Sequence, residues 1–305
     1  MNCVSIDTVN DQWSDWLLHR RHANNPEYQE VINREVDQYA EWVLTNAQLG
    51  ASMTLADIGT GEGLIALRAI QRIGPSLQVI LTDVSSAMLQ HVEALAQQQG
   101  VYGQCRFLNC DAEHLQQIAT ASVDVVTTRS VLAYVNDKNA ALREFLRILK
   151  PNGRLSCAEP VFRDDALAAK ALKQVLDTRT PEVKDHFMLL LHRWKSAQFP
   201  DTDEKICNSP IANYSERDLV QMVHNCGFAD IHMEFHMDVL PSSIPSWEVF
   251  IESSPHPWAP SLRTIMAEQF SLEEQAFFEK ILRPSIENIH AVSIERMLYL
   301  SAVKP

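Results

Sequence analysis

A glycine-rich turn between two short apolar runs constrains this chain more than any other feature. The turn, residues 59–63, follows the run 54–58, which contains Asp57; a helical pattern and a second apolar run ending at Asp83 come next. Strand, glycine turn, helix, strand and acid together are typical of a βαβ unit that binds a nucleoside-containing ligand. Glycine permits positive φ and a close backbone approach. A carboxylate about 20 residues beyond the turn can accept hydrogen bonds from two ribose hydroxyls.

The spacing of the glycines separates two classes of ligand. Dinucleotide folds use G-x-G-x-x-G, but here the glycines are Gly59, Gly61 and Gly63, and Leu64 stands where the third dinucleotide glycine should be. With Asp57 in front, the pattern D-x-G-x-G-x-G resembles motif I of class I S-adenosylmethionine (SAM)-dependent methyltransferases. The competing interpretation is a turn that only connects a strand to a helix.

A second block carries the same resemblance independently. Residues 122–128 read as a fourth strand, 138–149 as a helix, 150–154 as a turn and 155–159 as a fifth strand. The block, SVDVVTTRSVLAYV through FLRILKPNGRLSCAEP, closely resembles ubiquinone/menaquinone-type and related small-molecule methyltransferases. The two blocks cover residues 50 to 160. The resemblance implies an α/β fold with a doubly wound, mostly parallel seven-stranded sheet and an antiparallel final pair.

The resemblance also implies which residues contact the cofactor, SAM. The expected contacts are Asp57, Gly59, Thr60, Gly61, Gly63, Asp83, Val84, Asp111, Ala112 and Arg129. Asp57 and the glycines would shape the methionine-tail pocket, Asp83 would hold the ribose and Asp111 the adenine. Asp111 has an alternative role as a helix cap. Arg129 would hold the methionine carboxylate or an anionic acceptor, or form an ion pair with Asp111 or Glu159.

Two residues are candidate general bases. A hydroxyl, amine or acidic-carbon acceptor must lose a proton, whereas a thioether needs no base. Glu159, at the end of the fifth strand, and His192, which can titrate near neutral pH, could take that proton. Glu159 could instead pair with Arg129, and His192 is one of eleven histidines, most of which have no catalytic role.

The remaining chain predicts a cap on this core. We expect N-terminal helices in 1–47, a SAM-binding core in 48–160, a helical lid insertion in 161–213, a core helix and strand in 214–240, a second helical insertion in 241–290 and a closing strand in 291–305. Both insertions follow strands, so they should lie over or beside the carboxyl edge of the sheet. Residues that could line the acceptor pocket, or form ordinary core instead, are Phe187, Met188, His192, Trp194, Tyr214, Trp247 and Trp258.

Composition narrows the partners. A formal charge of −13 argues against nucleic acid or an anionic membrane. No apolar run approaches the ~18 residues of a membrane span. The N-terminus lacks signal-peptide features. Six cysteines without a C-x-x-C pair suggest a reduced cytoplasmic protein and no metal site.

An enclosed pocket favours a small-molecule substrate over a macromolecule. The oligomeric state is open, with a homodimer as one possibility. Two other functions compete with methyl transfer. A nicotinamide-dependent oxidoreductase is disfavoured by Leu64 and by the second block. The other is a SAM-binding member of the fold that catalyses a reaction other than methylation, such as a cyclisation.

Overall fold

The computed structural model describes residues 11–178 and 185–305 of the chain. Its centre is one seven-stranded sheet in the order β3-β2-β1-β4-β5-β7-β6. The five strands from β3 to β5 run parallel, and β7 lies antiparallel between β5 and β6. This confirms the predicted doubly wound, mostly parallel α/β fold. The strands are β1 (Thr54–Ile58), β2 (Gln78–Asp83), β3 (Cys105–Asn109), β4 (Val123–Arg129), β5 (Leu149–Pro160), β6 (Ala229–Pro241) and β7 (Val292–Val303).

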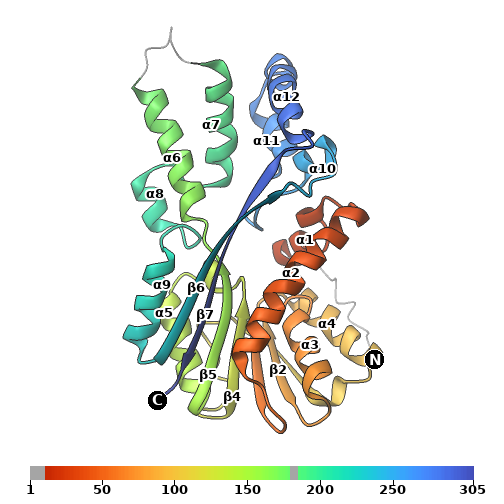
Figure 1. Cartoon of the computed structure of the whole chain (residues 1–305), viewed down its shortest axis with the longest axis vertical. Coiled ribbons are helices and arrows are strands. Elements are labelled where there is room, and N and C mark those ends of the chain that lie inside the picture. The colour runs from red at the N-terminus through yellow and green to blue at the C-terminus, as the bar shows by residue number, and fades with distance from the viewer. Residues whose placement is uncertain (1–10, 179–184) are drawn as a thin grey trace, which may run out of the picture.

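Helices cover both faces of the sheet (Figure 1). One buried cluster joins α2, α3 and α4 to the strands, and another joins α5 and α9 to the opposite face. The core helices are α2 (Pro26–Ala47), α3 (Leu64–Ile73), α4 (Ser86–Gln98), α5 (Lys138–Ile148) and α9 (Glu216–Cys226), with short 3-10 helices η1 (Arg20–His22), η2 (Tyr102–Gln104) and η3 (Leu132–Tyr134).

The sequence also predicts three helix starts from their capping residues, and all three form. The side chain of Asn25 accepts from the Tyr28 N–H with Pro26 at the first helical position of α2, and Ser85 caps α4. In α9, Ser215 and Asp218 form a reciprocal capping box.

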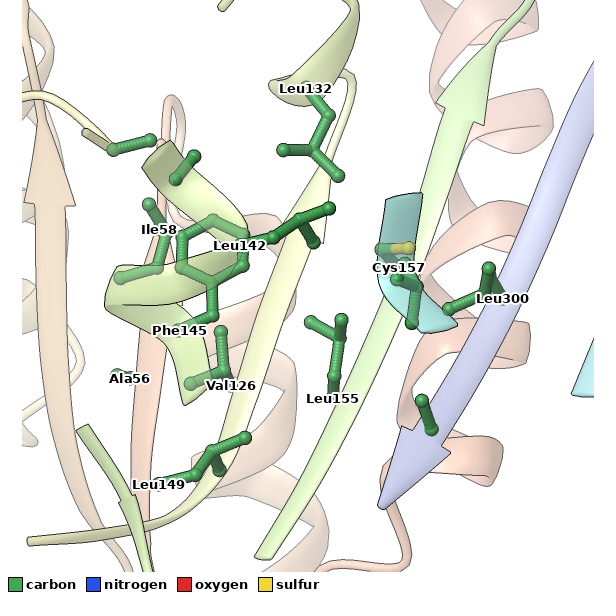
Figure 2. Packing of buried hydrophobic residues seen from close by; sticks show 14 of the residues in the cluster. Ala56, Ile58, Val126, Leu132, Leu142, Phe145, Leu149, Leu155, Cys157 and Leu300 are labelled. Carbon is green, nitrogen blue, oxygen red and sulfur yellow. The ribbon is translucent and has the colours of Figure 1, made fainter. Parts of the chain in front are cut away.

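Strands of the sheet centre are apolar on both faces. Figure 2 shows Phe145 of α5 packed among Ile58, Val126 and Leu155 of three neighbouring strands. A doubly covered parallel sheet requires such continuous apolar strands, which explains why the runs 54–58 and 123–129 do not alternate.

Both insertions are helical and stand beyond the carboxyl ends of the parallel strands (Figure 1). The first contains α6 (Arg163–Asp177), α7 (His186–Gln198) and α8 (Asp203–Asn208); the second contains α10 (Trp247–Glu252), α11 (Leu262–Gln269) and α12 (Leu272–Ile286). Helices α7, α10, α11 and α12 share one apolar cluster. The helices of the two insertions, together with α1 (Gln12–Leu18), make up the cap.

Two predicted boundaries differ from the structure. The expected turn 150–154 belongs to β5, which begins at Leu149 and has an irregular register with β4 near Val125. Asn152 takes a φ of 62° there, so the strand is bent where the sequence indicated a turn. Within the first insertion the sequence also predicts a helix over 183–194. Its start lies outside the described residues, and its described part, α7, continues past Trp194 to Gln198.

Candidate active site

One large cavity lies at the carboxyl edge of the sheet. It has a volume of about 560 Å³ and is bounded by the ends of β1, β2, β4 and β5, by the N-terminal helices and by loops of both insertions. Ligands of open α/β sheets bind at this edge, next to the point where the strand order reverses. Here that point lies between β1 and β4.

The glycine turn forms one wall of the cavity. Gly59 and Gly61 line it with φ values of 65° and 53°. A Cβ added to Gly59 would lie 2.4 Å from Cγ2 of Val131, and one added to Gly61 would meet Leu17 of α1. Gly63, which the sequence predicted to contact the cofactor, is instead the N-cap of α3 and does not line the cavity.

Asp57 holds this turn in place. Its buried carboxylate accepts from the hydroxyls of Thr60 at 2.7 Å and Thr127 at 2.8 Å. Burial raises the pKa of Asp57 to about 6, and the two hydroxyl bonds and the nearby Arg129 oppose that rise. Both Asp57 and Thr60 border the cavity, but the bonds of Asp57 fasten β1 to the turn and to β4.

Asp83 joins the turn to the end of β2. Its two oxygens accept from the backbone N–H groups of Gly61 and Ser85, both at 2.9 Å. Burial raises the pKa of Asp83, and these backbone bonds oppose the rise. A carboxylate offers about four lone pairs, so two remain for a ligand in the cavity, which Asp83 and Val84 both line.

Asp111 follows β3 and also lines the cavity, with Ala112. Its carboxylate accepts from the Glu113 backbone N–H at 2.9 Å and contacts Nδ1 of His114 at 2.9 Å. The Asp111 side chain therefore stabilises its local turn and also borders the cavity. Both roles that the sequence left open are compatible with its position.

Arg129 reaches the cavity from the end of β4. Neither predicted ion pair is formed: within the described chain, no carboxylate forms an ion pair with its guanidinium. Burial lowers the pKa of Arg129, as does the neighbouring Arg21, while Glu62, Asp57 and Glu159 oppose the shift. A desolvated cation without a partner favours an anionic ligand group.

The two predicted bases do not face the cavity. Glu159 is fully buried and accepts from the Thr128 hydroxyl and from the backbone N–H groups of Val131 and Ala133. Burial raises its pKa, and these hydrogen bonds oppose the rise. Glu159 thus orders the loop after β4 and lies outside the cavity lining.

His192 lies on α7, outside the cavity lining, and its Nε2 is 3.0 Å from Asp201. Asp201 also binds Lys205. The structure therefore places this histidine in a local ion-pair network of the cap. Neither predicted base is part of the cavity lining.

The seven pocket candidates of the cap are not in the cavity lining. Phe187, Trp194 and Trp247 belong to the apolar cluster of the cap. Tyr214 donates to the Pro160 carbonyl at 2.6 Å. Trp258 packs edge-on against Trp13 and Tyr134, which do line the cavity. Aromatic residues of these helices serve mainly as core, as their helical spacing also allowed.

The sequence also failed to single out several lining residues, among them Tyr39, Glu295 and Arg296. Tyr39 lies in the expected N-terminal helical region, where its hydroxyl gave no separate signal. Glu295 and Arg296 lie in the predicted closing strand, and only the pairing register shows that they pass the sheet edge. In the structure the Tyr39 hydroxyl donates to Oε2 of Glu295 at 2.6 Å.

Comparisons with known proteins agree with this geometry. A profile of the methyltransferase domain family matches residues 49–210. The ubiquinone/menaquinone biosynthesis C-methyltransferase UbiE of Idiomarina loihiensis is 36% identical over 107 residues, which are 35% of this chain and 42% of that protein. The chain therefore spans less than half the length of this curated relative.

Solved structures share the fold. The YcgJ protein of Bacillus subtilis aligns with a TM-score of 0.56 and 18% identity over 88% of this chain and 98% of its own. The geranyl diphosphate C-methyltransferase of Streptomyces coelicolor, solved with S-adenosyl-L-homocysteine (SAH), aligns with a TM-score of 0.52 and 17% identity over 93% of this chain and 86% of its own. At these identities the likeness shows the fold alone.

Proposed function

We propose, from the premise that this chain belongs to the methyltransferase domain family, that it is a SAM-dependent methyltransferase acting on a small metabolite. The observation that carries the proposal is one cavity onto which the glycine turn, Asp83, Asp111 and Arg129 all open. These residues come from four successive strand ends. No other arrangement in the described chain gathers so many of the predicted cofactor contacts.

The residues present fit the cofactor. Gly59 and Gly61 carry no side chains, so the backbone of the turn can approach a ligand at these two positions. Asp83 keeps free lone pairs for ribose hydroxyls, and Asp111 with Ala112 lies where the adenine is expected. Arg129 offers an unpaired charge to the methionine carboxylate or to an anionic acceptor. When bound, SAM supplies an electrophilic methyl group on a sulfonium.

The cap supports a small acceptor. Residues of α1, of the loop before α6 and of the loop between α10 and α11 close over the cavity, as Trp13, Phe162 and Pro257 show. A partly covered, apolar-lined site can hold the reactants in line and limit access of water, so that proximity and orientation do much of the work. Such a cover favours a small acceptor over a long polymer.

Two expectations from the sequence stay proposals. We expect a cytoplasmic enzyme, and a homodimer is one assembly it could form. Among the described residues, no helix combines the length and apolarity that crossing a membrane requires. The nature of the acceptor atom, oxygen, nitrogen, carbon or sulfur, is open within the proposed function.

Methyl-labelled SAM tests the proposal. The purified chain is incubated with the low-molecular-mass fraction of a cell extract, and products are separated by mass spectrometry. We expect label in a small-molecule product and SAH in equal amount. Tight SAM binding with no transfer would favour a non-methylating member of the fold, and binding of NADH instead of SAM would favour the oxidoreductase alternative.

A further inference from the structure

The cavity has two halves, which lie over different strands of the sheet. The proposed cofactor contacts Asp83 and Asp111 follow β2 and β3, on one side of β1. The other half lies over β4, β5 and β7. An acceptor that approaches the methyl group must occupy this second half, because the first is filled by the nucleoside.

Strand β7 reaches past the sheet into the second half. Its pairing with β5 ends where Pro160 meets Met297, but its pairing with β6 continues to Val292. The two strands therefore rise above β5 as a ribbon (Figure 1). Glu295 and Arg296 are the first residues of β7 beyond the end of β5, and both line the cavity.

Alternation along β7 sends these two side chains to opposite sides. Met297 and Tyr299 pack in the cluster of α2, so Glu295, two residues away, faces α2 as well. There it accepts from the Tyr39 hydroxyl at 2.6 Å. Arg296 faces α6, with its guanidinium near Asp164 at 3.3 Å and Asp165 at 3.6 Å. The charge of Arg296 is therefore balanced by carboxylates other than Glu295.

The negative charge of Glu295, in contrast, is not balanced by a cation. In the described ranges 11–178 and 185–305, no lysine or arginine forms an ion pair with it. The titratable groups around it are phenols and acids: Tyr28, Glu35 and Tyr39 on α2, Asp238 opposite on β6, and Tyr299 on its own strand.

Two neighbours of Glu295 have raised pKa values, which favours their neutral, protonated forms. Burial, then its hydrogen bond and charge contact with Glu295, raises the pKa of Tyr39. Burial and the charge of Glu295 also raise the pKa of Glu35. Tyr39 donates its hydroxyl to Glu295, and Glu295, unlike Glu35, is a carboxylate that lines the cavity.

We propose that Glu295 is the general base of the reaction and that Tyr39 is its positioning residue, so that the acceptor is a hydroxyl or amine. The inference rests on the proposed function. The acceptor oxygen or nitrogen gives its proton to Glu295 while its lone pair bonds to the methyl carbon. The carbon–sulfur bond breaks, and its electron pair stays on sulfur as SAH leaves. Protonated Glu295 then returns the proton to solvent.

Glu295→Gln tests the base. The amide keeps the shape and accepts the Tyr39 hydrogen bond but cannot take a proton. Positioned general bases contribute about 10²–10⁴-fold, so transfer of methyl label into the small-molecule fraction of a cell extract should fall at least about 100-fold. Calorimetric affinity for SAH should stay within about twofold. Glu295→Asp should restore part of the rate.

Glu234→Gln is the matched control. Glu234 lies on β6, contacts His236 and Trp42, and is outside the cavity lining. The rate of this variant should match that of the unmodified chain.

A second variant tests Tyr39. Tyr39→Phe removes the hydroxyl that holds the Glu295 carboxylate in place. In a chain that transfers methyl groups, kcat should fall at least about tenfold, while KM for SAM and the calorimetric affinity for SAH stay within about twofold. In the Glu295→Gln background, the same substitution should not lower the rate further, because the two residues act as one unit.

The outcomes separate the two proposals. Full transfer by Glu295→Gln, in a chain that transfers methyl groups, would overturn the base and leave the proposed function standing. An unchanged kcat in Tyr39→Phe would overturn the positioning role. Absence of transfer by the unmodified chain would overturn the proposed function and this inference together.

Discussion

The backbone N–H of Gly61 donates to Oδ2 of Asp83 across 2.9 Å, which ties the turn after β1 to the end of β2. The link makes turn and acid one rigid unit at the wall of the cavity. A ligand that binds Asp83 therefore meets a turn whose conformation the protein has already fixed. Such preorganisation lowers the entropy cost of binding.

Gly59→Ala should damage both stability and binding. The added methyl would require a φ near 65° and would lie 2.4 Å from Val131. Left-handed backbone and overpacking each cost about 1–3 kcal/mol, so the free energy of unfolding should fall by about 2–6 kcal/mol. Chemical denaturation measures this. Gly103→Ala is the control, because its added Cβ meets no atom within 4 Å; an equal loss there would contradict the account.

Asp57→Asn should change how stability depends on pH. In the folded chain, burial raises the pKa of Asp57 from its ordinary value of 3.8 to about 6. Protonation therefore favours folding, and this contribution is full below the unfolded pKa and lost as pH rises through the folded one. The stability of the natural chain relative to Asp57→Asn should fall by up to about 3 kcal/mol between pH 4 and 6. Parallel urea titrations at several pH values would reveal it, and a constant difference would refute the assignment.

Arg129→Met should discriminate between two ligands. If Arg129 holds the methionine carboxylate, loss of a charged hydrogen bond worth about 1.5–3 kcal/mol weakens SAH binding roughly 10- to 100-fold. Binding of 5′-methylthioadenosine, which lacks that carboxylate, should not change. Calorimetry with both ligands measures the contrast. Equal weakening of both would indicate a structural role, and no change in either would leave the anionic acceptor as its partner.

Phe145→Ala should show how far the core depends on α5. Phe145 is 0% exposed in the cluster of Figure 2. Truncation of a buried phenylalanine costs about 3–5 kcal/mol. Phe277→Ala, whose ring is 36% exposed on α12, should cost much less. Thermal unfolding of both variants would test this, and similar melting temperatures would contradict the described packing.

The sheet and its cofactor edge were predictable because each depends on local signals. The glycine turn, the acids at strand ends and the apolar runs are short patterns with a direct structural meaning. Gly63 shows the limit of the motif, because its positive φ belongs to the N-cap of α3 and the residue is outside the cavity lining. The spacing alone does not distinguish these two demands for glycine.

The acceptor half was not predictable, because it depends on long-range packing. Glu159 ends a strand as a base should, yet backbone N–H groups of the next loop surround it. No motif in the sequence marks Glu295. It reaches the cavity only because β7 extends beyond the end of its pairing with β5. Whether a charged residue faces a core, a loop or a cavity depends on segments that are distant in the sequence, 26 residues away for Glu159 and 256 for Glu295.

Calorimetric titration of the full chain with SAH and, separately, with NADH tests the central claim most directly. The account predicts saturable binding of SAH with no heat from NADH, and SAH affinity reduced at least about tenfold in Asp83→Ala, which loses the ribose acceptor. Binding of NADH without SAH, or SAH binding that is unaffected by Asp83→Ala, would contradict it.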